Sequence, residues 1–354
     1  MLDQSTEING VLAMKKVTMS DIAKRTGFSI KTVSRVINHS KEVKPATRKK
    51  ILNAIEETNF SVNLIAKALK NQQTKTIILF IDKHGGSYWN AWHSLIIMKI
   101  ITDFKSWGYK VILSPSSALG VIDDETDGFI LLKSGIADGA VLFDNLMGDI
   151  RIKYLRENNI PFVILGKDFD YHDTCYVDLD NFHVGEIGAQ HLIEQGFHNI
   201  SFFLGNEEFY VNKSRVNGFK KICETHDIIY HIEYAVNSLQ DACESTKNHL
   251  QNHHSDAFFV SGDEKITAVY KALKEAGKTI PDDVGVLGID NLPQSQYLDP
   301  SLSSIDQNVD QFAKTVVDTL LETMQADKRI SKGVLIKPAL EVRYSTKKSG
   351  DISK

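Results

Sequence analysis

Side chains that can contact nucleic acid gather on one short stretch near the N-terminus. Within residues 29–38, Val33, Val36 and Ile37 recur at helical spacing and form an apolar stripe. The opposite face then carries Ile30, Lys31, Thr32, Ser34, Arg35 and Asn38. Such a face offers donors to base edges and phosphates, while the stripe holds the helix in place. The pattern predicts a DNA recognition helix.

Flanking helices must position this stretch. Thr18 and Asp21 have the spacing of a capping box at the start of a first helix. Gly27 permits a tight turn, and Ser29 is a good cap for the second helix. Pro45 suits the first turn of a third helix. The apolar stripe expected for this third helix is Ile51, Leu52 and Ile55. The three segments together predict a helix-turn-helix unit.

An ordinary amphipathic helical hairpin with a solvated basic face is the alternative. Residues 14–75 hold 14 Lys and Arg against 4 Asp and Glu, a net charge of +10. Residues 76–354 carry a net charge of −12. A basic headpiece on an acidic body is typical of a nucleic-acid reader joined to another domain, so the charge distribution favours DNA binding.

A short helical segment, SVNLIAKALK at residues 61–70, follows the headpiece. A helix of this length is marginal in water by itself, so we expect it to fold only on DNA or against a second copy. Leu69 beside Lys70 suits a minor-groove wedge with a neighbouring DNA contact. Plain helix packing is the alternative for Leu69, and spacing by itself favours it.

From Thr76 onward, short apolar runs alternate with amphipathic stretches. The runs are 76–81, 109–114, 128–132, 161–166, 174–178, 200–205, 257–262 and 284–290. The helical stretches are 94–107, 150–158, 182–195, 213–226, 239–252 and 266–276. This alternation predicts parallel sheets covered by helices, and the number of runs points to two doubly wound subdomains. In such folds, ligands bind outside the carboxyl ends of the strands.

Signals for other classes of protein are weak. Gly85 and Gly86 follow the first apolar run, but no GxGxxG, GxxxxGK[ST], HExxH or GxSxG motif occurs. We therefore expect neither an enzyme nor a cofactor. Cys175, Cys223 and Cys243 are widely spaced, which predicts no metal site and fits the cytoplasm. No apolar run reaches membrane-spanning length. Residues 1–13 lack a basic start and a long apolar run, so we expect no secretory signal there, and Met14 is a candidate start.

Beyond these patterns, two phrases resemble the headpiece and hinge helix of the lactose-repressor (LacI/GalR) family of bacterial transcription regulators. They are DIAKRTGFSIKTVSRVIN and NFSVNLIAKALK. The phrases DGFILLKS, PFVILGK, YVDLDN, SRVNGFKK and VGVLGIDNLPQSQYLDP extend the resemblance over residues 76–345, with the nearest likeness to maltose-operon-type repressors. The resemblance implies an α/β protein with an all-α headpiece and a periplasmic-binding-protein-like body. It further implies a homodimeric repressor of carbohydrate-utilisation genes that binds a palindromic operator.

Roles for single residues follow from the resemblance. It implies that Ile30, Lys31 and Arg35 face base edges, and that Leu69 opens a central base step. The implied phosphate contacts are Ser29, Thr32, Ser34, Asn38 and Asn63, and Ala66 and Lys70 complete the DNA-binding set. Lys44 departs from the family because a capping Ser is usual there, and Val62 departs because a Pro is usual before the hinge helix.

A small-molecule site is expected in the body. Trp92 can stack on a sugar ring, although a packed helix start is an equal alternative. Arg215 matches the family's pocket arginine and can donate two hydrogen bonds to hydroxyls or a carboxylate. Asp263 can accept from sugar hydroxyls or cap a helix. Weaker candidates at strand ends are Ser134, Lys167, Asn237 and Asp290.

The expected effector is an inducer, maltose, a malto-oligosaccharide or a related α-glucoside. One alternative is a regulator controlled mainly by a protein co-regulator or by a non-sugar ligand. A remote alternative is a sugar-binding component of a transport system, against which the basic headpiece and the missing signal peptide argue.

The expected boundaries follow these patterns. They are a lead-in at 1–14, the headpiece at 15–61, a hinge helix and linker at 62–74, the body at 75–345 and a tail at 346–354. Within the body, residues 75–178 with 307–330 form one subdomain and residues 179–306 with 331–345 the other. Residues 115–127 leave too little room for a crossover helix before the run at 128–132. We therefore expect the first subdomain to lack a helix.

Overall fold

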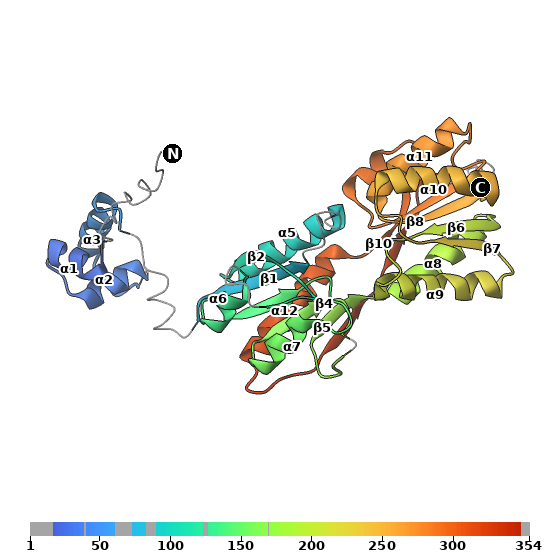
Figure 1. Ribbon diagram of the computed structural model, residues 1–354. Coiled ribbons are helices and arrows are strands. Elements are labelled where there is room, and N and C mark those ends of the chain that lie inside the picture. Colours follow the sequence, from blue (N-terminus) through green and yellow to red (C-terminus); the bar gives the residue numbers. More distant parts are fainter. Residues whose placement is uncertain are drawn as a thin grey trace, which may run out of the picture. The chain divides into compact units, whose positions relative to one another are not determined.

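The computed structural model describes residues 17–38, 40–60, 73–82, 90–122, 127–168 and 170–347 (Figure 1). The chain divides into two compact units, a headpiece and a body, with the boundary between Thr74 and Lys75. The expected hinge helix lies outside the described residues, and so do Asn63, Ala66, Leu69 and Lys70. None of the helices in the described ranges is long and apolar enough to cross a membrane.

The headpiece contains the expected helices. They are α1 (Met19–Thr26), α2 (Ile30–Ile37) and α3 (Pro45–Glu57). The predicted capping box is confirmed, because the backbone N–H of Thr18 donates to the Asp21 carboxylate at 2.9 Å and the Thr18 hydroxyl accepts from the Asp21 N–H. Gly27 ends α1 with a φ of 75°, a backbone conformation that favours glycine. Ser29 caps α2 by accepting from the N–H of Thr32 at 3.1 Å.

A small apolar core holds these helices together. Its fully buried members are Ile22, Val33, Val36 and Ile51. The expectation for Leu52 is wrong, because this side chain is 45% exposed while Ala54, one turn on from Ile51, is buried instead. Lys44 precedes α3 and makes no side-chain cap, so this helix begins on Pro45 at its first turn without that hydrogen bond.

The body contains two sheets, as predicted, and each has six strands. The first has the order β11-β5-β4-β3-β1-β2, and the second has the order β12-β10-β9-β8-β6-β7. The first sheet consists of β1 (Thr76–Asp82), β2 (Lys110–Ser116), β3 (Gly139–Leu142), β4 (Phe162–Leu165), β5 (Tyr176–Leu179) and β11 (Gly333–Ile336). The second consists of β6 (Asn199–Phe203), β7 (Ile229–Glu233), β8 (Ala257–Ser261), β9 (Gly285–Ile289), β10 (Ser303–Asp306) and β12 (Ala339–Glu341). Neighbouring strands pair in parallel except β10 and β12, which are antiparallel.

Helices cover both faces of each sheet (Figure 1). The first sheet packs α5 (Ala91–Ser106) and α12 (Val309–Gln325) on one face, and α6 (Phe129–Lys133) and α7 (Ile150–Glu157) on the other. The second packs α8 (Asn181–Glu194) and α9 (Tyr210–Thr225) on one face, and α10 (Leu239–Asn252) and α11 (Ile266–Glu275) on the other. Because side chains alternate along a strand, Ile77 and Leu79 face α5 while Ile78 and Phe80 face α6.

The first crossover in the body corrects an expectation. Residues 128–132 were expected to form a strand, but Phe129–Lys133 is the short helix α6, and the strand is Gly139–Leu142. Phe129 and Leu132 lie one helical turn apart and both are buried against the sheet. The expected loss of a crossover helix after residues 115–127 is therefore wrong. The helix is present and is only five residues long.

Three crossings connect the two subdomains. The chain passes from β5 to α8, from β10 to α12, and from β11 to β12. The expected boundary at residue 331 is wrong, because β11 pairs in parallel with β5 of the first sheet. This crossing instead lies between Ile336 and Ala339, so the first subdomain keeps six strands.

Candidate functional site

The outer face of α2 carries the side chains that were predicted to contact DNA. Ile30 is 51% exposed, and Lys31, Arg35 and Asn38 are also exposed. Thr32 and Ser34 are partly exposed, and the Ser29 hydroxyl lies 2.9 Å from that of Thr32. Because Val33 and Val36 are fully buried in the headpiece core, they fix the rotation of α2 about its axis and keep this polar face outward.

Arg35 has a weak internal partner. Its Nη2 atom lies 3.3 Å from the Glu42 carboxylate, and the two side chains are 47% and 70% exposed. Exposed ion pairs contribute about 0–1 kcal/mol, so this contact leaves the guanidinium able to move to a phosphate or a base.

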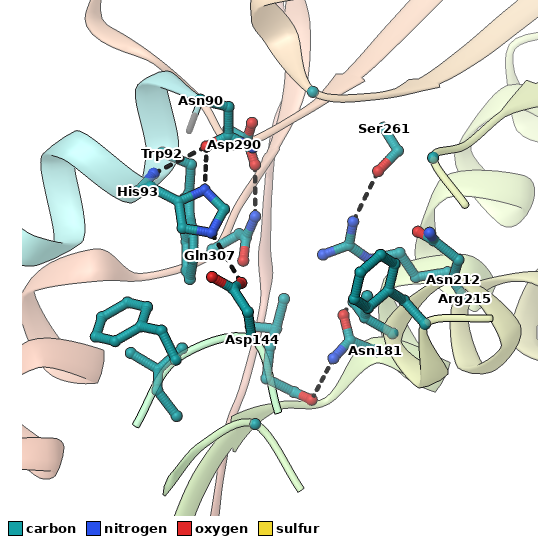
Figure 2. Close-up of a pocket in the computed structure, with 18 of the residues that line it drawn as sticks. Asn90, Trp92, His93, Asp144, Asn181, Asn212, Arg215, Ser261, Asp290 and Gln307 are labelled. Carbon is teal, nitrogen blue, oxygen red and sulfur yellow. Dashed lines mark hydrogen bonds and ion pairs between the residues drawn. The ribbon is translucent and has the colours of Figure 1, made fainter. Parts of the chain in front are cut away.

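A second candidate site is a cleft between the two subdomains of the body (Figure 2). It encloses about 1260 Å³, including the space that is open to solvent. Among the predicted effector residues, the structure brings together Trp92, Lys167, Arg215, Asn237 and Asp290. The cleft lies where several strands of both sheets end, as expected for doubly wound folds.

Two predicted effector residues do not line the cleft. Ser134 ends α6, where its hydroxyl donates to the carbonyl of Ile130 at 2.6 Å. Asp263 is 3% exposed and accepts hydrogen bonds from Ser295 at 2.6 Å and from Ser304 at 2.8 Å. It ties the end of β8 to the segment that follows β9 and to β10, so its role is in the packing of the second subdomain. Burial raises the pKa of this carboxyl above its usual value.

Close packing of α8 on α9 positions Arg215. A Cβ atom on Gly185 would lie 1.9 Å from the carbonyl oxygen of Arg215, and one on Gly218 would lie 1.9 Å from that of Phe182. Only glycine permits this approach of the two helix backbones. The Arg215 Nε atom then donates to Asn181 at 2.9 Å and its Nη1 atom to Ser261 at 2.8 Å (Figure 2). The guanidinium is thereby held at the wall of the cleft.

The first subdomain contributes a polar group at the start of α5. The Asn90 side chain caps this helix by accepting from the backbone N–H of His93 at 2.9 Å. The His93 ring joins Asn90 to Asp144, with Nδ1 at 2.7 Å from the Asn90 oxygen and Nε2 at 3.1 Å from the Asp144 carboxylate (Figure 2). Trp92 packs edge-on against Phe312, with ring centroids 6.2 Å apart. Both interpretations of Trp92 are therefore compatible with the fold, since it starts a helix and also lines the cleft.

Buried charges surround the cleft. Burial raises the pKa of Asp178 to about 6, against the opposing influence of Arg215 and Lys167. Burial also raises the pKa of Asp290, which accepts a hydrogen bond from Gln307 (Figure 2). Burial lowers the pKa of Lys265. Large pKa shifts are frequent at functional sites, because burial there removes charged groups from water.

Sequence reasoning missed several residues of the cleft. They are Asn90, His93, Asp144, Asn145, Asp178, Asn181, Asn212, Ser261, Glu264, Lys265 and Gln307. Some of these were open to prediction, because Asp144 follows β3 closely and Gln307 follows β10 directly. Asn212 was not, because it lies in the first turns of α9, which begins three residues before the expected start at Lys213. In the described part of the chain, no group of three or more His, Cys, Asp or Glu is arranged to hold a metal ion.

Two family models match the chain. Residues 18–63 match the bacterial regulatory proteins of the LacI family, and residues 189–346 match a periplasmic binding protein-like domain. Among characterised relatives, the transcriptional repressor PurR of Photobacterium profundum is 26% identical over 336 residues, which cover 93% of this chain and 98% of that protein.

Solved structures share the fold. A lac repressor dimer bound to operator and the anti-inducer ONPF aligns with a TM-score of 0.80 and 24% identity, over 94% of this chain and all of that one. A probable maltose operon transcriptional repressor from Staphylococcus aureus aligns with a TM-score of 0.69 and 21% identity, over 77% of this chain and 98% of that one. At these identities the two structures establish the fold alone.

Proposed function

We propose that this chain is a repressor of carbohydrate-utilisation genes, because residues 18–63 match the bacterial regulatory proteins of the LacI family and its relatives include transcriptional repressors. It would bind a palindromic operator as a homodimer and be released by a small sugar. The observation that carries this proposal is the outward polar face of α2, held in place by buried Val33 and Val36. A cytoplasmic location follows from this function.

We assign the DNA contacts to this face. Ile30, Lys31 and Arg35 would read base edges, because they are exposed on the outer side of α2. Ser29, Thr32, Ser34 and Asn38 would contact phosphates, together with Asn63. Ala66, Leu69 and Lys70 would act in the minor groove at the centre of the operator.

The dimer proposal is supported by exposed apolar side chains on the first subdomain. On the edge strand β2, Ile112 is 38% and Leu113 is 42% exposed, and in the segment that follows, Val121 is 78% exposed. Apolar side chains left exposed along an edge strand can pair with a second copy. Pairing two copies along this face would present two headpieces to two half-sites.

The effector would bind in the cleft of the body. Aromatic Trp92 and the hydrogen-bonding groups of Arg215 and Asn212 offer the combination that a sugar ring needs, an apolar face and fixed polar groups. A maltose-like α-glucoside is our proposal for the sugar scaffold. By linkage, an effector that weakens DNA binding must itself bind less tightly to the DNA-bound form.

Fluorescence anisotropy tests this function. Duplexes selected from a palindromic library with a central CG step would be titrated with the full chain at two salt concentrations. We expect tight binding that weakens steeply with salt, and release by maltose, maltotriose or an acidic derivative. Arg35→Ala should lose about 1–3 kcal/mol of operator-binding free energy and should relax the sequence preference. The matched control is Lys24→Ala, because Lys24 is exposed on α1, outside the recognition helix.

The possible outcomes separate the candidate functions. Binding that no small molecule alters, but that responds to an added protein, would favour a regulator controlled by a protein partner. If the selected duplexes bind no better than random DNA, the repressor function is wrong.

A further inference from the structure

Lys265 is a buried cation in the wall of the cleft. It follows β8, in the short helix η1 (Asp263–Lys265), and only 7% of its surface is exposed. Its Nζ atom donates to the backbone carbonyl of Val236 at 2.9 Å. An ammonium group has three donors, and within the described ranges no carboxylate oxygen lies within 4.0 Å of this one. This ammonium has one neutral hydrogen-bond partner, and Glu264, Asp290 and Asp241 act on its charge only from beyond 4.0 Å, so its charge is incompletely compensated.

Lys167 approaches the same cleft from the first subdomain. It follows β4 and is half-buried, and its Nζ atom lies 5.9 Å from the centre of the Tyr210 ring. Among residues that the structure describes, this ammonium has no ion-pair partner within 4.0 Å either. The two subdomains therefore each present one lysine to the cleft.

The carboxylates of the cleft, in contrast, have donors from the protein. Asp144 pairs with His93 at 3.1 Å, and Asp290 accepts from Gln307. Glu264 accepts from the backbone N–H of Ala91 at 2.9 Å, across the cleft. Asp178 accepts from the backbone N–H of Leu179 at 2.8 Å and from Asn181. Within the described residues, each of these carboxylates thus has a hydrogen-bond donor while neither lysine has an ion-pair partner, and the neutral Trp92 Nε1 donor is also buried without a hydrogen bond.

We propose that the effector of this cleft is an acidic sugar, whose carboxylate or phosphate binds Lys265 and Lys167. The inference rests on the proposed function, because it specifies the ligand of the same cleft. An anionic group would complete the hydrogen bonds of a buried ammonium, whereas a neutral hydroxyl would leave its charge uncompensated. Because the lysines belong to opposite subdomains, the anion would also hold the cleft closed.

Calorimetric titration of the full chain with three disaccharides measures how a negative charge on the sugar changes its affinity. The three sugars share a glucosyl unit. Maltose is uncharged, maltose 6′-phosphate carries a phosphate, and maltobionate carries a carboxylate. Glucose, glucose 6-phosphate and glucuronate form a second set if the disaccharide does not fit. We expect at least one acidic member to bind roughly 10- to 100-fold more tightly than its neutral counterpart, as charge-assisted hydrogen bonds would give. The tighter of the two acids tells whether phosphate or carboxylate is preferred.

Substitutions then assign the preference to residues. Lys265→Met should abolish most of the preference, and Lys167→Met part of it, measured in each variant as the ratio of the affinities for the acidic and the neutral sugar. Lys271→Met is the matched control, because Lys271 lies on the adjoining α11 and its side chain is 70% exposed. Without effector, Lys265→Met should unfold at the same temperature as the wild-type chain or higher, because it removes a buried charge that lacks a carboxylate partner.

Several results would overturn the proposal. They are equal binding of neutral and acidic sugars, a preference that survives Lys265→Met, or no binding of any of the six probes at millimolar concentration. A lower unfolding temperature of Lys265→Met without effector would assign this lysine to structure instead. Operator binding is measured separately, so its failure would refute the repressor function without deciding the preference for an anion.

Discussion

The two subdomains of the body share one strand order but differ in one crossover. In each, the chain runs from the edge strand through a helix to the third strand of the sheet. In the first subdomain this helix is α6, with five residues, and in the second it is α10, with 14 residues. Topology therefore constrains where the crossover helix lies, but tolerates a large difference in how much of the sheet it covers.

Each helix is anchored by different chemistry. Phe129 of α6 is 2% exposed and stacks on Phe80 of β1, with ring centroids 4.1 Å apart. In α10 the buried anchor is polar, because His249 lies 2.8 Å from the Ser201 hydroxyl and 3.3 Å from the Glu233 carboxylate. The short helix is thus anchored by apolar and aromatic contacts, while the long helix includes a buried hydrogen-bonded imidazole.

Removing the aromatic anchor should have the largest effect. Phe129→Ala should lower the free energy of unfolding by about 3–5 kcal/mol, because it opens a cavity against Phe80. Urea denaturation measures this loss. Ile130→Ala, at a neighbouring position that is 43% exposed, is the control and should change stability by no more than about 0.5 kcal/mol. A loss below about 1 kcal/mol for Phe129→Ala would show that α6 is not held by this contact.

Close helix packing in the second subdomain should give the next largest effect. Gly185→Ala places a methyl group against the backbone of α9 and should destabilise the chain by about 1–3 kcal/mol or more. It should also weaken effector binding, because it displaces Arg215. The control is Gly120→Ala in the first subdomain, where the nearest atom to an added Cβ is the Ser117 Cβ at 3.1 Å, compared with 1.9 Å at Gly185. Equal losses would mean that the α8–α9 contact can relax.

The edge strands offer a test of the dimer surface. Leu113→Asp on β2 should shift sedimentation from dimer to monomer and weaken operator binding, while the protomer stays folded. Ile229→Asp on β7, the equivalent edge of the second sheet, is the matched variant, since Ile229 is 60% exposed. We expect it to leave the dimer intact. Dissociation by Ile229→Asp alone would move the interface to the second subdomain.

The polar anchor should make a small pH-dependent difference. Burial lowers the pKa of His249 below its usual 6.5. Two further imidazoles, His231 and His253, face it, and the ring centroids of His231 and His249 lie 5.9 Å apart. Burial also lowers the pKa of His231. Since the unfolded chain binds the proton more readily, this contribution to stability is present above pH 6.5 and is lost as the pH falls below it.

Unfolding temperatures of the wild-type chain and of His249→Gln, measured between neutral and mildly acidic pH, check this sign. The wild-type chain should lose more stability than the variant on acidification. Asp178 has the opposite effect on stability, because its raised pKa makes folding less favourable as the pH rises toward neutrality. This effect is common to the wild-type chain and to His249→Gln, so the difference between the two removes it. If acidification affects both chains equally, protonation of His249 is not coupled to unfolding.

Prediction from sequence succeeded where a pattern is local. The caps at Thr18 and Ser29 and the buried stripe of α2 follow from spacing over a few residues. It failed at residues 128–132, because a short apolar run fits a strand and a buried helical turn equally well. It also missed β7, β10, β11 and β12. The residues of β7, for example, are mostly half-buried and carry His231 and Glu233 among apolar ones.

Sequence by itself determined the headpiece, its basic charge and the doubly wound class of the body, because each depends on local periodicity and composition. Only the tertiary structure decided which strand-end residues meet. Lys167 and Lys265 are 98 positions apart, and the cleft brings them together, whereas Asp263 is turned into the core of its own subdomain. The physical reason is that neighbouring side chains at a strand end point in different directions. Whether each one faces the cleft or a core depends on how the two sheets are joined.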